Sequence, residues 1–129
     1  MFNQFEWRHL PALFTATVST VAILWPTTSP RRALLAFGFP LPIADSPAAA
    51  PVMMIAQVRT TTIGLVMFIL YFKGQMEALD VIMAVYGTIA GIIDSYTVWK
   101  QGRRKRAIYR LATSGIGAAC GIIGVTAGN

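Results

Sequence analysis

Four apolar runs, separated by polar or proline-rich segments, divide the chain. A helix that crosses the hydrocarbon core of a bilayer needs about 20 mostly apolar residues. The runs predict membrane-spanning helices over residues 10–25, 52–72, 78–99 and 108–127. The pattern therefore predicts an all-α integral membrane protein, with residues 1–129 forming a single domain built as a bundle of four transmembrane helices.

The connection between the first two runs is rich in proline. Six of the seven prolines fall within residues 26–51, and proline interrupts a helix because it lacks the backbone N–H. Residues 31–39 are apolar enough for a short interfacial or re-entrant helix that begins near Pro30 and ends at Gly38 and Pro40. Long connections are functional or disordered, so this segment is a candidate part of the site.

The composition changes the expected solvent from water to lipid. The chain is 55% hydrophobic and only 12% charged, whereas soluble domains carry about 25% charged residues. Most of the basic residues behind the net charge of +6 lie within residues 100–110, between two apolar runs. That placement is typical of a cytoplasmic topology anchor. The lipid bilayer is therefore the expected partner, and nucleic acid is not.

The orientation follows from the basic residues in the connections. With four crossings, the first and third connections share one side of the membrane, and the other side carries only Arg8 and Lys73. The positive-inside rule then places the basic loop 100–106 in the cytoplasm and both termini on the non-cytoplasmic face. In a fungal protein the expected membrane is the endoplasmic reticulum. The basic residues of the first and third connections are Arg31, Arg32, Lys100, Arg103, Arg104, Lys105 and Arg106.

Glycine spacing predicts how the last two helices associate. Gly87 and Gly91 lie four residues apart in the third run, and Gly117 and Gly121, with Gly124 beyond, lie in the fourth. Small residues at this spacing allow membrane helices to approach closely. We expect these two helices to touch. A chain this small encloses little volume, so a homodimer is also expected.

Apart from Arg110, which belongs to the basic stretch 100–110, three charged residues fall inside the predicted spans. An ionised side chain near the bilayer centre costs at least about 2.5–3.5 kcal/mol on insertion scales, so each one requires an explanation. Asp80, with Glu77, lies at the start of the third span and is interpreted as a boundary residue. Arg59 and Asp94 lie at similar depth in antiparallel helices, which predicts that they form an ion pair.

That pair has two interpretations, a structural lock between two helices or part of a catalytic site. In the catalytic interpretation Asp45, from the proline-rich connection, folds over the bundle and supplies a second carboxylate, so that Asp94 and Asp45 divide acid and base roles around Arg59. Neither a metal nor a cofactor is expected, because the chain has one cysteine and one histidine. The expected substrate-binding residues are Gln57, Tyr86 and Tyr96, with Ser95 and Tyr109 as further hydrogen-bonding groups.

Four short motifs occur along the chain: Phe37-Gly38-Phe39-Pro40, Val58-Arg59 with Gly64, Ile93-Asp94, and Lys100-Gln101-Gly102. Together they resemble a family of short four-helix membrane proteins of unknown function, distantly similar to the DoxX-like proteins. The resemblance covers roughly residues 31–124, and it departs from the family at Thr60, where other members often have an acidic residue. It implies that Arg59 and Asp94 are the polar pair. Some fungal members look like tailoring enzymes of polyketide or terpenoid pathways, including membrane epoxide hydrolases.

Three functions follow from these observations. The first is a cofactor-independent enzyme that opens an epoxide, by hydrolysis or cyclisation, on a lipophilic secondary metabolite. The second is a non-catalytic membrane partner or assembly factor, in which the polar pair is structural. The third is a small dimeric transporter, which is disfavoured because the first run, residues 10–25, has no acidic residue.

Overall fold

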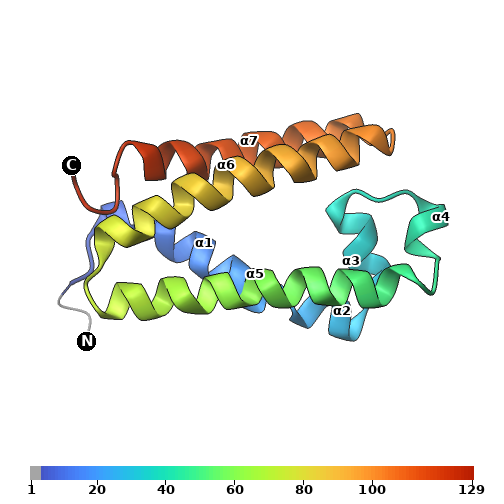
Figure 1. Ribbon diagram of the computed structural model, residues 1–129, viewed down its shortest axis with the longest axis horizontal. Helices are drawn as coiled ribbons and strands as arrows, with labels where there is room; N and C mark the ends of the chain where they lie inside the picture. The colour runs from blue at the N-terminus through green and yellow to red at the C-terminus, as the bar shows by residue number, and fades with distance from the viewer. Residues whose placement is uncertain (1–3) are drawn as a thin grey trace.

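The computed structural model describes residues 4–129, and within this range all the regular structure is helical (Figure 1). The long helices α5, α6 and α7 alternate in direction, and a 3-10 helix and four shorter α-helices precede them. In chain order the elements are the 3-10 helix η1 (Trp7–His9), α1 (Leu10–Val21), α2 (Leu24–Thr28), α3 (Pro30–Phe37), α4 (Leu41–Ala44), α5 (Ala49–Phe72), α6 (Met76–Lys100) and α7 (Arg104–Ile122).

Three helical stretches are long and apolar enough to cross a membrane: Trp7–Thr28, Ala49–Phe72 and Met76–Lys100. Large apolar side chains are exposed along them, as a lipid environment requires. These features confirm the predicted all-helical, membrane-compatible fold. The fourth predicted span, α7, is not among the three, since four basic residues occupy its first seven positions.

The first predicted span is broken into α1 and α2. The break falls at Ala22 and Ile23 because the ring of Pro26 is incompatible with a helical carbonyl four residues earlier, at Ala22. The backbone N–H of Ile23 donates instead to Oγ1 of Thr61 in α5, at 3.1 Å. The interrupted backbone is therefore stabilised by a neighbouring helix.

The helices α6 and α7 form a tightly packed hairpin, which confirms the contact that the glycines predicted (Figure 1). A methyl group on Gly91 would lie 2.5 Å from Cβ of Ser114, and one on Gly87 would lie 2.9 Å from the backbone N of Ala118. Gly121 is packed equally closely against α6. Gly117 has open space beside it, so it is not part of this contact.

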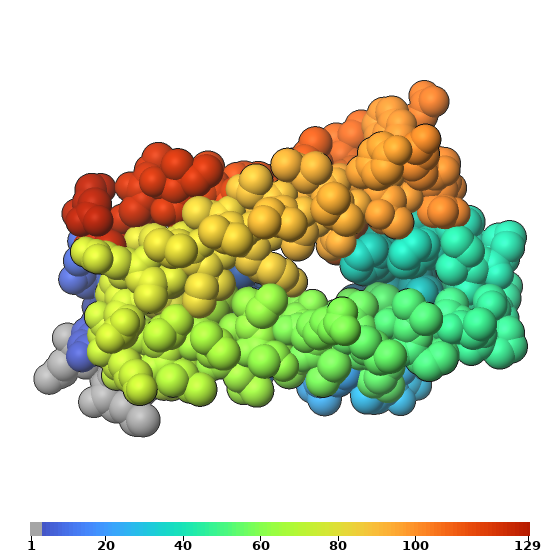
Figure 2. Space-filling view, viewed as in Figure 1, coloured from blue at the N-terminus to red at the C-terminus, as the bar shows by residue number. Residues whose placement is uncertain are grey.

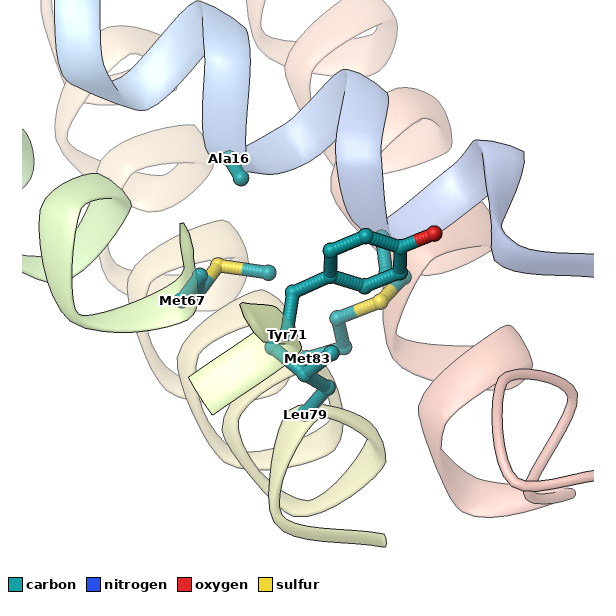
Figure 3. Packing of buried hydrophobic residues seen from close by; sticks show 6 residues of the cluster. Ala16, Met67, Tyr71, Leu79 and Met83 are labelled. Carbon is teal, nitrogen blue, oxygen red and sulfur yellow. The ribbon is translucent and has the colours of Figure 1, made fainter. Parts of the chain in front are cut away.

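A second pair, α1 and α5, packs below the hairpin, with Gly64 of α5 against the backbone of α1 at Ala16 and Thr20. The two pairs meet near the chain termini around a core contributed by α1, α5 and α6 (Figure 3). We call this region the closed end. Its buried core residues are Ala12, Ala16, Met67, Tyr71, Leu79 and Met83.

Away from the closed end the pairs diverge, and the short helices α3 and α4 lie between them (Figure 1). As predicted, α3 begins at Pro30 and ends at Gly38, whose φ of 120° lies in a region that glycine tolerates. Gly38 packs against Val98 of α6 and Arg106 of α7. We call this region the basic end, because it holds the α6–α7 loop. Figure 2 shows the molecule hollowed between α5 and α6 beside α3.

Candidate functional site

A cavity of about 450 Å³ lies where the two helix pairs diverge. Its walls come from α1 and α2 on one side, α3 at the basic end, and α5, α6 and α7 on the remaining sides. A smaller pocket of about 220 Å³ adjoins it and shares Val18, Ser19, Tyr86, Asp94 and Arg110. Most lining side chains are apolar. The principal polar groups in the larger cavity are Gln57, Thr60, Tyr86, Asp94 and Arg110.

The ion pair of the cavity joins Asp94 of α6 to Arg110 of α7. The Nη2 of Arg110 donates to Oδ2 of Asp94 at 2.9 Å, and the two side chains are 27% and 35% exposed, respectively. The guanidinium also lies 3.7 Å from the ring centroid of Phe37 in α3, a cation–π contact that fixes its orientation. Oδ1 of Asp94 has no hydrogen bond to residues 4–129 and remains available to a ligand.

Arg59 is not the partner of Asp94, so the predicted Arg59–Asp94 pair is wrong. None of the salt bridges between residues 4 and 129 involves Arg59, which is exposed on the outer surface of α5. The cause is helical geometry. Gln57 and Thr60 point to the cavity, and Arg59 is rotated about 200° from the first and 100° from the second.

Asp45 also lies outside the cavity, so the structure does not place a second carboxylate beside Asp94. Asp45 follows α4 and accepts a hydrogen bond from Nε of Arg31 at 2.6 Å. Both side chains are more than half exposed. The proline-rich connection does fold back toward the bundle, but it presents α3 and Phe37 to the cavity and keeps Asp45 at the surface.

The three predicted substrate-binding residues divide between cavity and surface. Gln57 and Tyr86 line the cavity, and the hydroxyl of Tyr86 donates to Oγ1 of Thr60 at 3.3 Å, which links α6 to α5. Tyr96 is 59% exposed and lies beneath the ammonium of Lys100, 5.5 Å from the ring centroid. Tyr96 is therefore a surface residue of the basic end.

Arg110 is the cavity residue that the sequence interpretation missed, because its position places it with the basic topology anchor. A signal for it was present. The turn of the α6–α7 hairpin is centred on Gly102, and Asp94 and Arg110 lie eight residues before and after it. Gly91 and Ser114, which also contact each other, lie 11 residues before and 12 residues after Gly102. Counting outward from the turn would have paired the two charges.

Asp80 has a structural role that differs from the predicted boundary position. Its side chain is buried, and its two oxygens accept hydrogen bonds from the backbone N–H of Thr126, at 3.1 Å, and of Ala127, at 2.7 Å. Both oxygens are used, so Asp80 anchors the turn after α7. Across residues 4–129 no group of three or more His, Cys, Asp or Glu side chains is placed to hold a metal ion.

Comparison with known proteins assigns the chain to a family but not to an activity. No curated protein and no solved structure matches it significantly. Residues 16–124 match a family described as a domain of unknown function, DUF4267. The matched range begins within α1 and includes the cavity ion pair and the whole of α5, α6 and α7. It supports the predicted relationship to a small membrane family of unknown function. The chain therefore belongs to the DUF4267 family.

Proposed function

We propose that the protein binds a lipophilic small molecule in the cavity and opens an epoxide on it, by hydrolysis or cyclisation, without a cofactor. The observation that carries the proposal is the Asp94–Arg110 pair in the cavity wall. It combines a carboxylate that has a free oxygen with a guanidinium held in place by Phe37. Such a pair supplies a base and a cationic hydrogen-bond donor in a confined space.

The size and lining of the cavity support a lipophilic ligand. Small-molecule sites have volumes of about 300–1,000 Å³ and are mostly apolar, with a few polar groups that fix orientation. The cavity matches this description, since its apolar lining includes Val18, Trp25 and Phe37. It opens at the surface of a molecule whose apolar helices suit a bilayer. A substrate dissolved in lipid reaches such a site more readily than a water-soluble one.

The proposed reaction needs only one carboxylate. Asp94 takes a proton from water, or from a hydroxyl of the substrate, as that oxygen attacks one epoxide carbon. The ring C–O bond breaks and its electron pair remains on the ring oxygen, where the N–H groups of Arg110 stabilise the negative charge. The proton on Asp94 then passes to this oxygen, which yields a diol or a cyclic ether alcohol and regenerates the carboxylate.

In this scheme Arg110 takes the role first assigned to Arg59, and Asp94 performs both proton transfers without Asp45. Tyr86 and Gln57 lie on α6 and α5. Tyr86 is two helical turns from Asp94, about 12 Å along the axis. It is therefore suited to hold a second polar group of the substrate and not to act on the epoxide.

We further propose that α7 is a fourth membrane crossing and that the protein works as a homodimer. At 1.5 Å per residue, α7 is about 28 Å long, and it packs along α6 through Gly91 and Ser114, so the two share the same depth. Its basic residues lie at one end. Four crossings put both termini on the non-cytoplasmic face and the loop 100–106 in the cytoplasm. Labelling of single cysteines at residues 103 and 128 on opposite sides of sealed vesicles tests this topology.

A structural function for the ion pair is the second candidate. Asp94 and Arg110 join the same two helices that Gly91 and Ser114 bring together, so the pair could simply lock the hairpin in a non-catalytic membrane partner. Exchanging the two charges, in Asp94→Arg with Arg110→Asp, separates the candidates. A lock survives the exchange because the pair is retained. Catalysis does not survive, because the carboxylate moves to another helix.

The experiment compares the wild type with Asp94→Asn, Arg110→Gln and the charge exchange, each purified in detergent and incubated with lipophilic epoxides from polyketide and terpenoid extracts. Products are followed by mass spectrometry in ¹⁸O-labelled water, which marks hydrolysis. We expect at least about a hundredfold loss of product in all three, with helicity unchanged. Arg59→Gln is the matched control and should convert normally. Absence of conversion by the wild type, or normal conversion by Asp94→Asn, would overturn the proposal.

A further inference from the structure

A second hollow, separate from the cavity, lies under the proline-rich connection. This groove has a volume of about 560 Å³ and is formed by α3, α4 and the first two turns of α5. Its lining is almost wholly apolar, and Ser46 supplies the one hydroxyl among the lining side chains. The other lining residues are Leu34, Phe37, Phe39, Pro42, Ile43, Ala48, Ala49, Val52, Met53 and Ala56.

The rim of the groove carries an arginine. Leu34 lines the groove, and Arg31 precedes it by one turn on the same face of α3. The Nε of Arg31 donates to Asp45, which lies in the chain between the lining residues Ile43 and Ser46. The two Nη groups of Arg31 make no hydrogen bond to residues 4–129. They are free to donate to an anion at the mouth of the groove.

The groove lies at the depth of a membrane interface. At the basic end α3 contacts α7, because Nη1 of Arg106 donates to the carbonyl oxygen of Ala36 at 3.4 Å. At this end the guanidinium of Arg104 lies 5.1 Å from the ring centroid of Trp99. Tryptophan and cations concentrate at the lipid headgroup level of membrane proteins. An apolar groove there, with an arginine at its rim, is adjacent to both the acyl chains and the phosphates of lipids.

We propose that the groove binds an acyl chain of an anionic phospholipid and that Arg31 binds the phosphate of the same molecule. The apolar lining matches the chain, and the free Nη groups match the phosphate, since a guanidinium donates two parallel hydrogen bonds to phosphate oxygens. Asp45 orients Arg31 and also competes with the phosphate for it, because both are anions on one guanidinium.

This inference does not depend on the proposed function. Phe37 and Met53 line both hollows, so the groove and the cavity share a wall, but the groove contains neither Asp94 nor Arg110. The binding of lipid is read out directly, as lipid retained by the protein. The outcome therefore stands whether or not the protein converts an epoxide.

The experiment measures lipid retention by native mass spectrometry of the purified full chain. The chain is titrated with phosphatidic acid and with phosphatidylcholine of identical acyl chains. Arg31→Gln removes the proposed phosphate ligand. Arg32→Gln is the matched control, because it removes the same charge from the next residue, about 200° around the helix from Leu34. Ala56→Trp fills the groove, and Val66→Trp places the same bulk on another exposed position of α5.

We expect the wild type to retain phosphatidic acid more strongly than phosphatidylcholine. Arg31→Gln should weaken anionic lipid binding about fivefold, and Arg32→Gln should weaken it less. Asp45→Asn should strengthen it, and Ala56→Trp should reduce the binding of both lipids while Val66→Trp does not. Equal retention of the two lipids by the wild type, equal losses in the two arginine variants, or full retention in Ala56→Trp would overturn the proposal.

Discussion

Two carboxylates on α6, at opposite ends of the molecule, have contrasting surroundings. At the closed end Asp80 is buried and both of its oxygens accept backbone hydrogen bonds from the turn after α7. Toward the basic end Asp94 is about one-third exposed, uses one oxygen to bind Arg110 and faces a cavity. The same side chain on one helix is thus fully used for structure at one end and partly free at the other.

The two ends therefore differ in how they use a carboxylate: Asp80 uses both oxygens for the fold, and Asp94 leaves one oxygen without a hydrogen bond to residues 4–129. The closed end also buries His9, whose Nδ1 lies 3.3 Å from the hydroxyl of Tyr71. A buried polar group that has lost its partner costs free energy, because water cannot replace the hydrogen bond. Substitutions at the closed end should therefore reduce stability, and substitutions in the cavity should mainly affect the ligand.

The largest expected stability effect is that of Asp80→Ala. Removing the carboxylate leaves the N–H groups of Thr126 and Ala127 without their acceptors, and hydrogen bonds to charged groups contribute about 1.5–3 kcal/mol each. We expect a loss of about 3 kcal/mol in unfolding free energy, measured by thermal unfolding in detergent. Glu77→Ala, an exposed position one turn earlier, is the control. Equal stability of the two variants would refute the anchoring role of Asp80.

A smaller effect is expected at the glycines of the α6–α7 hairpin. Gly91→Ala would place a methyl group 2.5 Å from Cβ of Ser114, which forces the helices apart at a cost of about 1–3 kcal/mol. Gly117→Ala meets nothing within 4 Å, and alanine favours the helix by up to about 1 kcal/mol. Thermal unfolding should move in opposite directions for the two. A shift in the same direction would contradict the packing described here.

Arg110→Gln should affect stability less than either of these. Its side chain is 27% exposed, and ion pairs with solvent access contribute about 1 kcal/mol or less. We expect a small decrease in unfolding temperature together with loss of cavity ligand. A decrease as large as that of Asp80→Ala would make the ion pair structural and favour the non-catalytic candidate.

The smallest effect is expected for Arg59→Gln, since Arg59 is exposed and is not in any salt bridge within the described range. Surface substitutions of this kind change unfolding free energy by about 0.5 kcal/mol or less. Ligand binding should be unchanged as well. A strong loss of ligand binding in this variant, measured beside Arg110→Gln, would support Arg59 as the arginine of the site, as the sequence predicts.

Much of the fold follows from the sequence, because apolar length and glycine spacing are local signals. The α3 helix was predicted from Pro30 and Gly38, and the hairpin contact was predicted from Gly87 and Gly91. The division of the first span into α1 and α2 was not, although Pro26 indicates it. The predicted span stops at residue 25, just before Pro26, whereas a second helix begins at Leu24 and continues through this proline to Thr28.

The site was predicted less well, because it depends on which helices are neighbours. Asp94, Gln57 and Tyr86 do line the cavity. Arg59 was paired with Asp94 on depth alone, and depth does not determine the direction in which a side chain points. The close partner of α6 is α7, which the glycines already indicated. Applying that contact to the charges would have selected Arg110.

The most direct test compares Asp80→Asn and Asp94→Asn in parallel, with unfolding temperature and epoxide conversion measured on each preparation. Each substitution removes one negative charge from α6 and preserves side-chain shape. Asp80→Asn should unfold at a markedly lower temperature than the wild type and, while folded, still convert the substrate. Asp94→Asn should unfold at close to the wild-type temperature and lose conversion. The reverse pattern, or loss of both properties in both variants, would contradict the division between a structural end and a chemical end.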